Sequence, residues 1–221
     1  MTDWGAHTRR EEERYLDGES RLPGEGDHDA RQRQLTRMGN AAAGAALAEL
    51  MDGNTDSARE WFAKAVERYR ESYEHAPPGS WGRPIGSLKA RILAGDWGGA
   101  EQDAEWTLGE HAAQAASPIG RYAGCLALLV LGRDREARIL ADGLRTHEDF
   151  PTAVGDALAF IAAQDIVGYT EAVEDVLKSF EARDEYLEDL PVADTVLVLQ
   201  ALADRRNMAA ELSSPLLPAQ N

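Results

Sequence analysis

Apolar residues recur along almost the whole chain at the three- and four-residue spacing of one face of an α-helix. The residue types that dominate the composition, Ala, Leu, Glu and Arg, favour helix formation. Alternating apolar and polar positions, which mark a half-buried strand, are almost absent, and neither Asp52-Gly53 nor Asp142-Gly143 lies between such runs. The pattern therefore predicts an all-α protein of about nine to eleven helices.

The N-terminal part is predicted to form a helix over about residues 6–16 that stops near Gly18. A loop rich in Pro and Gly follows at residues 22–27. A long helix is then expected from Asp29 to Met51, with small side chains over residues 40–46 that permit close helix contact. We therefore expect an N-terminal helical arm and loop over residues 1–26 and a single α-helical repeat domain over residues 27–221.

The rest of the chain repeats one pattern, in which a helix ends, a short turn follows and the next helix carries an Ala in its first turns. Its four instances have turns at Gly53, Gly95, Gly132 and Gln164 and alanines at Ala58, Ala100, Ala137 and Ala172. Pro84-Ile85-Gly86 is echoed by Pro118-Ile119-Gly120. Repeated helical hairpins of this length predict an α-solenoid, in which each hairpin buries its apolar face against its neighbours.

One segment, residues 57–65, resembles the second helix of a tetratricopeptide repeat. Ala58, Phe62 and Ala65 have the small-large-small spacing of that family. The resemblance implies a tetratricopeptide-like α-solenoid of stacked helical hairpins. A helical bundle built from similar hairpins is the alternative.

The charge balance limits the choice of partners. The chain has 23 Lys and Arg residues against 39 Asp and Glu residues, a net charge of -16. Such a surface repels phosphate groups, so we expect no nucleic-acid partner and no binding to anionic membranes. The acidic, lysine-poor composition resembles that of halophilic archaeal proteins, and the codon bias of a GC-rich genome is the alternative. We expect a halophilic protein on the charge argument.

Cys125 is the one cysteine of the chain and lies in the apolar run 125–131. We expect its thiol to be a small buried hydrophobic group and not a nucleophile, and one cysteine allows no internal disulfide. The N-terminal residues lack the apolar core of an export signal, and no apolar run reaches the roughly 20 residues that span a bilayer. These features favour a cytoplasmic protein without a membrane partner.

The residue types that carry chemistry show no pattern typical of an active site. The five histidines lack metal-ligand spacing, and we interpret them as surface or structural residues: His7, His28, His75, His111 and His147. Residues 52–56 resemble the start of a calcium loop, but Ser57 and Ala63 stand where Gly and Glu are needed. No nucleophile elbow, phosphate-binding loop or dinucleotide fingerprint is present. We therefore predict no catalytic residues, no metal site and no cofactor.

Two aromatic–basic pairs and one acidic segment are candidates for binding another protein. Trp81 with Arg83 and Arg121 with Tyr122 stand near the starts of successive predicted hairpins, where stacking would place them in one strip. Trp and Arg are frequent at binding hot spots, and packing between repeats is the alternative. The acidic ridge, Asp184, Glu185 and Glu188, is expected to steer a basic partner, with surface hydration as the alternative.

The C-terminal third carries a further resemblance, over residues 159–169, Leu177, residues 180–186, 191–203 and 212–218. It resembles the immunity protein 49 family of bacterial polymorphic-toxin systems. The similar features are a penultimate helix that ends in charged residues and a Tyr, an Ala/Leu-rich last helix and a closing Ser-Pro-Leu segment. The resemblance implies a non-enzymatic protein that neutralises a cognate toxin. The alternative is a small-molecule- or peptide-binding regulatory module, and a homo-oligomer is left open.

Overall fold

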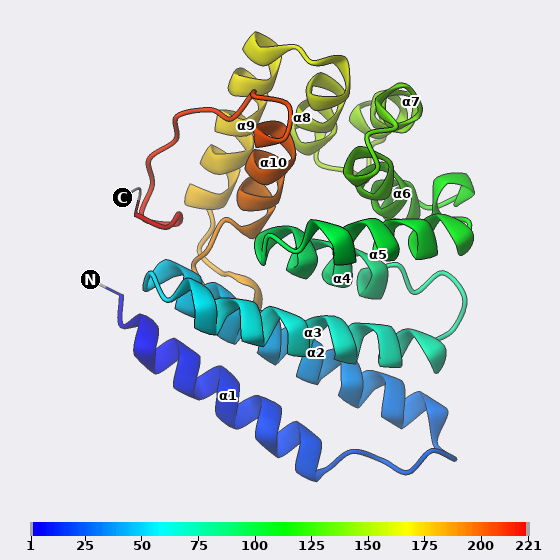
Figure 1. Ribbon diagram of the computed structural model, residues 1–221, viewed down its shortest axis with the longest axis vertical. Helices are drawn as coiled ribbons and strands as arrows, with labels where there is room; N and C mark the ends of the chain where they lie inside the picture. Colours follow the sequence, from blue (N-terminus) through cyan, green and yellow to red (C-terminus); the bar gives the residue numbers. More distant parts are fainter. Residues whose placement is uncertain (1, 220–221) are drawn as a thin grey trace. The chain divides into compact units, whose positions relative to one another are not determined.

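The computed structural model describes residues 2–219, apart from the side chain of Leu187. Over this range the chain forms ten α-helices, two 3₁₀ segments and no strand (Figure 1). The prediction of an all-α protein is confirmed, and the number of helices lies within the expected range. None of the helices in the described range is long and apolar enough to cross a membrane.

The elements follow one another along the chain in the order shown in Figure 1. They are α1 (Trp4–Ser20), α2 (His28–Met51), α3 (Thr55–Glu74), α4 (Gly82–Leu93), α5 (Trp97–Gly109), η1 (Ala112–Gln114), α6 (Pro118–Val130), α7 (Asp134–Arg145), α8 (Thr152–Ala163), α9 (Ile166–Glu181), η2 (Leu187–Asp189) and α10 (Asp194–Asp204). The first helix continues past Gly18, because this glycine allows α1 to approach α2. A Cβ at Gly18 would lie 2.7 Å from Cγ of Met38.

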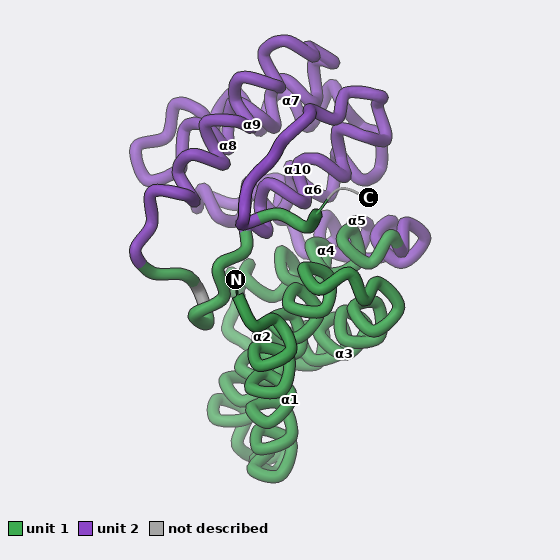
Figure 2. Tube along the Cα trace, turned by 90° about the vertical axis from the view of Figure 1, so that its left-hand side faces the viewer, with its two compact units in different colours: residues 1–95, 185–192, 217–221 green, residues 96–184, 193–216 purple. Residues whose placement is uncertain are grey.

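The chain divides into two compact units (Figure 2). Of the described residues, unit 1 comprises 2–95, 185–192 and 217–219, and unit 2 comprises 96–184 and 193–216. The segment predicted as an arm contributes α1 to unit 1, where it packs against α2. Residues 185–192 also belong to unit 1, although the chain on both sides of them belongs to unit 2.

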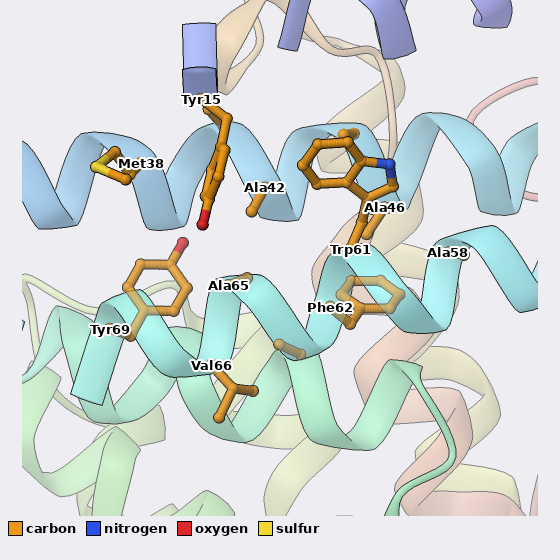
Figure 3. Close-up of a cluster of buried hydrophobic side chains, with 13 residues drawn as sticks. Tyr15, Met38, Ala42, Ala46, Ala58, Trp61, Phe62, Ala65, Val66 and Tyr69 are labelled. Carbon is orange, nitrogen blue, oxygen red and sulfur yellow. The ribbon is translucent and has the colours of Figure 1, made fainter. Parts of the chain in front are cut away.

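The core of unit 1 forms where α1, α2 and α3 meet (Figure 3). Ala42 and Ala46 on α2 are fully buried, and their small side chains leave room for the large rings of α3. Trp61 packs edge-on against Tyr15 of α1, with the ring centroids 5.7 Å apart. The small side chains of α2 therefore permit the close helix contact that the sequence predicts.

The four predicted hairpin turns share one backbone conformation. Each contains a residue with a left-handed φ angle, at Gly53 (84°), Gly95 (70°), Gly132 (68°) and Gln164 (54°). At three of the turns the residue after this position donates to the carbonyl five residues earlier, from Asn54 to Glu49 at 2.9 Å, from Arg133 to Leu128 at 2.9 Å and from Asp165 to Phe160 at 3.0 Å. This is the Schellman ending of a helix. The four predicted alanines are all buried: Ala58, Ala100, Ala137 and Ala172.

A hydrogen-bond network in unit 2 holds the segment after α10 in place. The Tyr169 hydroxyl donates to Oε1 of Gln200 at 2.6 Å. Gln200 in turn donates to the carbonyl of Ala210 at 2.6 Å and accepts from its amide at 3.0 Å. Tyr169 has no exposed surface, and burial raises the pKa of its hydroxyl. The extended residues after α10 are therefore fixed to α9 and α10.

Candidate binding surfaces

The first predicted pair, Trp81 and Arg83, lies at the start of α4 in unit 1. Arg83 donates from Nε to Oγ of Ser72 at 3.2 Å and from Nη2 to Oε1 of Gln32. Burial lowers the pKa of the Arg83 guanidinium. Arg83 therefore links α4 to α2 and α3, and Trp81 beside it is half-buried.

The second predicted pair, Arg121 and Tyr122, lies on α6 in unit 2. Arg121 donates from Nε to the carbonyl of Ala115 at 3.0 Å. Tyr122 is only 8% exposed, and its ring packs against Phe150 with the centroids 5.5 Å apart. Burial, together with the negative charge of Asp194, raises the pKa of the Tyr122 hydroxyl. Tyr122 therefore belongs to the interior of unit 2 and offers a partner little surface.

The predicted acidic ridge divides into exposed and engaged carboxylates. Asp184 and Glu185 are exposed, whereas Glu188 is half-buried. Glu188 forms an ion pair with Arg14 and accepts from Nδ2 of Asn40 at 3.3 Å. Arg10 donates to its backbone carbonyl. Glu188 therefore fixes residues 185–192 to α1 and α2, and the two exposed carboxylates remain accessible to a partner.

Glu11 is a fully buried carboxylate on α1 that the sequence pattern does not distinguish from the two glutamates that follow it. It accepts from Arg10 Nε at 2.8 Å and from Arg14 Nη1 at 2.7 Å. Gly44 on α2 makes room for it, because a Cβ there would lie 3.1 Å from Cγ of Glu11. Burial acts to lower the pKa of Arg14, but the hydrogen bonds and charges of Glu188 and Glu11 outweigh it and raise the pKa. The buried charge is thus compensated within unit 1.

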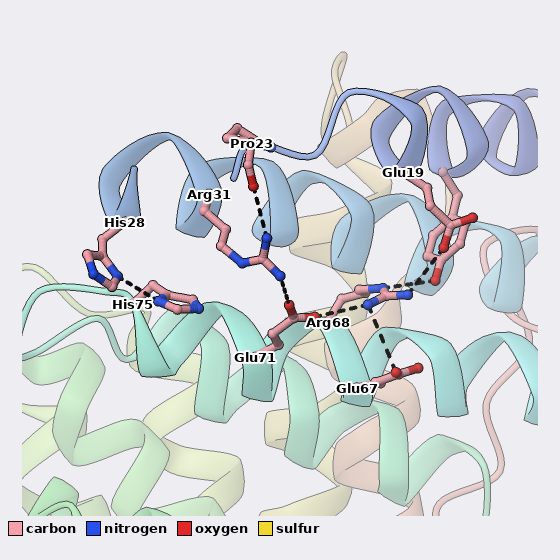
Figure 4. Close-up of polar contacts among 9 residues, drawn as sticks. Glu19, Pro23, His28, Arg31, Glu67, Arg68, Glu71 and His75 are labelled. Atoms are coloured by element: carbon pink, nitrogen blue, oxygen red, sulfur yellow. Dashed lines mark hydrogen bonds and ion pairs between the residues drawn. The ribbon is translucent and has the colours of Figure 1, made fainter. Parts of the chain in front are cut away.

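A second group of polar contacts links α1, α2 and α3 of unit 1 (Figure 4). Arg68 on α3 donates from Nε to the Tyr15 hydroxyl at 3.0 Å and from Nη1 to Glu71 at 2.9 Å. Glu71 also accepts from Arg31 at 2.6 Å. Arg31 donates from its other terminal nitrogen to the carbonyl of Pro23 at 2.9 Å, which ties the α1–α2 loop to this network.

Two histidines lie together near these contacts, as a separate hydrogen-bonded pair (Figure 4). His28 is the first residue of α2, and His75 is the C-cap of α3. Their Nδ1 atoms are 2.8 Å apart, so one ring donates a hydrogen bond and the other accepts it. The two residues are separated by 47 positions in the chain, and no local spacing could have predicted the pair.

Unit 2 carries a surface groove of about 360 Å³ next to an exposed aliphatic side chain. Ile139 on α7 is 73% exposed, the largest exposed fraction among the large hydrophobic side chains described. Arg133 and Glu136 form an ion pair of 2.6 Å at the edge of the groove. The lining residues come from α5, α6, α7 and the η1 region: Leu108, Ala113, Gln114, Leu128, Arg133, Glu136, Ile139 and Leu140.

Burial also explains why the one cysteine of the chain is not a candidate nucleophile. Cys125 is fully buried, and burial raises the pKa of its thiol to about 12. A thiol that stays protonated at neutral pH is a poor nucleophile. Among the residues that the structure describes, no group of three or more His, Cys, Asp and Glu side chains is placed to hold a metal ion.

No family model, curated protein or solved structure matches the chain.

Proposed function

We propose that this chain is a non-enzymatic protein-binding protein built as a tetratricopeptide-like α-solenoid. The repetition of one turn geometry supports the solenoid, because Gly53, Gly95, Gly132 and Gln164 all take the left-handed conformation and a buried Ala follows each turn. Repeats of this kind form extended surfaces suited to partner binding.

The observation that carries the binding proposal is the exposure of Ile139 beside the groove of unit 2. A few anchoring residues carry most of the energy of a protein interface, and we take an exposed aliphatic side chain beside a concave site as the candidate anchor. Ile166 and Val167 at the start of α9 in the same unit are also exposed, by 55% and 70%. In unit 1, Trp81 remains the candidate anchor. Asp184 and Glu185 supply negative charge that steers a basic partner.

The partner that we propose is a toxin, because the C-terminal third resembles the immunity protein 49 family. The net charge of -16 supports a basic partner, since opposite charges speed association. We place the protein in the cytoplasm, where an unpaired buried thiol such as Cys125 stays reduced. The acidic surface is proposed as an adaptation to high salt.

Co-expression tests the proposal most simply. The C-terminal domain of a toxin-like protein encoded beside this gene is expressed in a sensitive host, alone and together with this chain. Protection by the wild type, and its loss on Ile139→Asp, is the expected result. Leu16→Asp, on the exposed part of α1, is the matched control and should still protect. A neighbouring gene without a toxin domain, or a toxin that kills despite the chain, contradicts the proposal.

The groove itself favours a second candidate, a regulatory module that binds a small molecule or a peptide. Its volume of about 360 Å³ lies within the range of small-ligand pockets, roughly 300–1,000 Å³. Its lining combines aliphatic side chains with Gln114 and the Arg133–Glu136 ion pair, which suits a short amphipathic ligand. A thermal-shift screen distinguishes the two functions, because a ligand-binding module gains stability from a compound whose effect Leu140→Trp abolishes, in the absence of any toxin.

A further inference from the structure

The imidazole rings of His28 and His75 form a compact pair of nitrogen ligands on the surface of unit 1 (Figure 4). The ring centroids lie 5.0 Å apart with an interplanar angle of 37°. Both Nδ1 atoms face each other at 2.8 Å, and His28 is exposed to solvent. One Nδ1 carries the shared proton and the other accepts it, so two potential ligand nitrogens meet at one accessible point.

We propose that this pair binds a divalent transition-metal ion of the Ni²⁺, Cu²⁺ and Zn²⁺ group. Neutral imidazole is a preferred ligand of these ions. Two nitrogens bound to one ion at roughly 2.0–2.1 Å in tetrahedral geometry stand about 3.3 Å apart, so the rings must separate by about 0.5 Å and turn until both lone pairs point at the ion. The ring that donates the hydrogen bond in the free protein carries its proton on Nε2 when its Nδ1 binds the metal, so no proton is released.

The carboxylates one position after His28 and one turn before His75 are already engaged. Asp29, next to His28, accepts hydrogen bonds from Gln32 and Arg33. Glu71, one turn before His75, accepts from Arg31 and Arg68. No third His, Cys, Asp or Glu side chain in the described part of the chain is placed to join the pair, so water completes the coordination in this proposal. A site with two nitrogen ligands should discriminate against Mg²⁺ and Ca²⁺, which require oxygen ligands.

The position of the pair gives the metal a structural role. His28 begins α2 and His75 follows the end of α3, whereas the turn at Gly53 joins the opposite ends of these two helices. A metal ion bound to both rings would close the open end of the hairpin. Because the unfolded chain does not hold the two rings together, binding should stabilise the native state of unit 1.

Calorimetric titration of the untagged full-length protein with NiCl₂ tests the site, with MgCl₂ as the control for attraction to the acidic surface. One saturable Ni²⁺ site is expected, with the affinity reduced roughly tenfold or more by His28→Gln and by His75→Gln. His7→Gln removes a histidine from α1 and should leave binding unchanged. At free Ni²⁺ about ten times the dissociation constant, the melting temperature of the wild type should rise by roughly 3–6 °C.

A second measurement does not depend on the variants. Paramagnetic Ni²⁺ should broaden the NMR signals of two of the five histidine rings at substoichiometric metal, and these should be His28 and His75. Equal binding of Ni²⁺ by the wild type and His28→Gln, an equal response to Mg²⁺, or broadening of other histidines first would overturn the proposal.

Discussion

Gly86 on α4 lies so close to the ring of Tyr69 on α3 that a Cβ there would stand 2.6 Å from Cε2 of the tyrosine. On the other side of the ring, a Cβ at Gly39 on α2 would stand 2.8 Å from Cδ1. The Tyr69 hydroxyl donates to Oδ1 of Asn40 at 3.0 Å, which fixes the ring between the two glycines. Three helices of unit 1 are thus held together around one aromatic side chain.

Gly86→Ala should destabilise the protein by about 1–3 kcal/mol, because the buried ring of Tyr69 has no free space into which it can move. Gly82→Ala in the same helix is the matched control, since a Cβ there meets nothing within 4 Å. Urea unfolding followed by circular dichroism measures both variants. Equal stabilities of the two variants would show that the ring does not contact the backbone of α4.

Glu11→Gln should lower the free energy of unfolding by about 1–3 kcal/mol, because it removes a fully buried charge from between two guanidinium groups. The cost stays below that of a fully enclosed ion pair, since the side chains of Arg10 and Arg14 are 39% and 41% exposed and can be solvated.

The control for Glu11 lies on the same helix. Asp17 pairs with Arg21 at 2.7 Å, with side chains 51% and 73% exposed. Asp17→Asn should change the free energy of unfolding by less than about 0.5 kcal/mol. A cost for Glu11→Gln as small as that for Asp17→Asn would contradict the buried position of Glu11.

Gln164→Gly should raise the free energy of unfolding by about 0.5–1 kcal/mol, because a side chain disfavours the left-handed conformation of residue 164. The opposite change at the equivalent turn, Gly132→Ala, should destabilise by about 1 kcal/mol or more. Gly143→Ala within α7 is the control, and it should be neutral or slightly stabilising because no atom lies within 4 Å of its Cβ position. Thermal unfolding measures all three, and a loss of stability in Gln164→Gly would contradict the shared turn geometry.

The melting temperature should rise between dilute buffer and molar KCl, because the net charge of -16 produces repulsion that salt screens. The screening length falls from roughly 10 Å at 0.1 M to roughly 3 Å at 1 M. Exposed ion pairs such as Arg138–Asp142 weaken in salt and oppose the rise by only a few tenths of a kcal/mol. A flat or falling melting temperature would mean that the acidic composition has no role in stability at high salt.

The features that the sequence predicted well are local. A left-handed residue between the end of one helix and the start of the next determines where a hairpin turns, and a few neighbouring residues suffice to show it. Gly132 was therefore recognisable, and so was Gln164 by its place in the repeat. The buried Ala137 that follows the turn belongs to the same local pattern.

The contacts that were missed join distant parts of the chain. Arg10 meets the carbonyl of Glu188 across 178 positions, and His28 meets His75 across 47. The burial of Tyr122 likewise depends on Phe150, which the pattern around residue 122 does not contain. The apolar spacing of α7 predicts a helix but does not show that Ile139 stays in solvent.

The most direct test of the proposed function is calorimetric titration of this chain with the purified toxin domain encoded beside its gene. We predict one saturable site with one-to-one stoichiometry. Ile139→Asp should weaken it by roughly tenfold or more, because it places a charge in the apolar contact, while Leu16→Asp should leave it unchanged. The absence of binding, or the same affinity for the wild type and Ile139→Asp, would contradict a binding surface at the groove of unit 2.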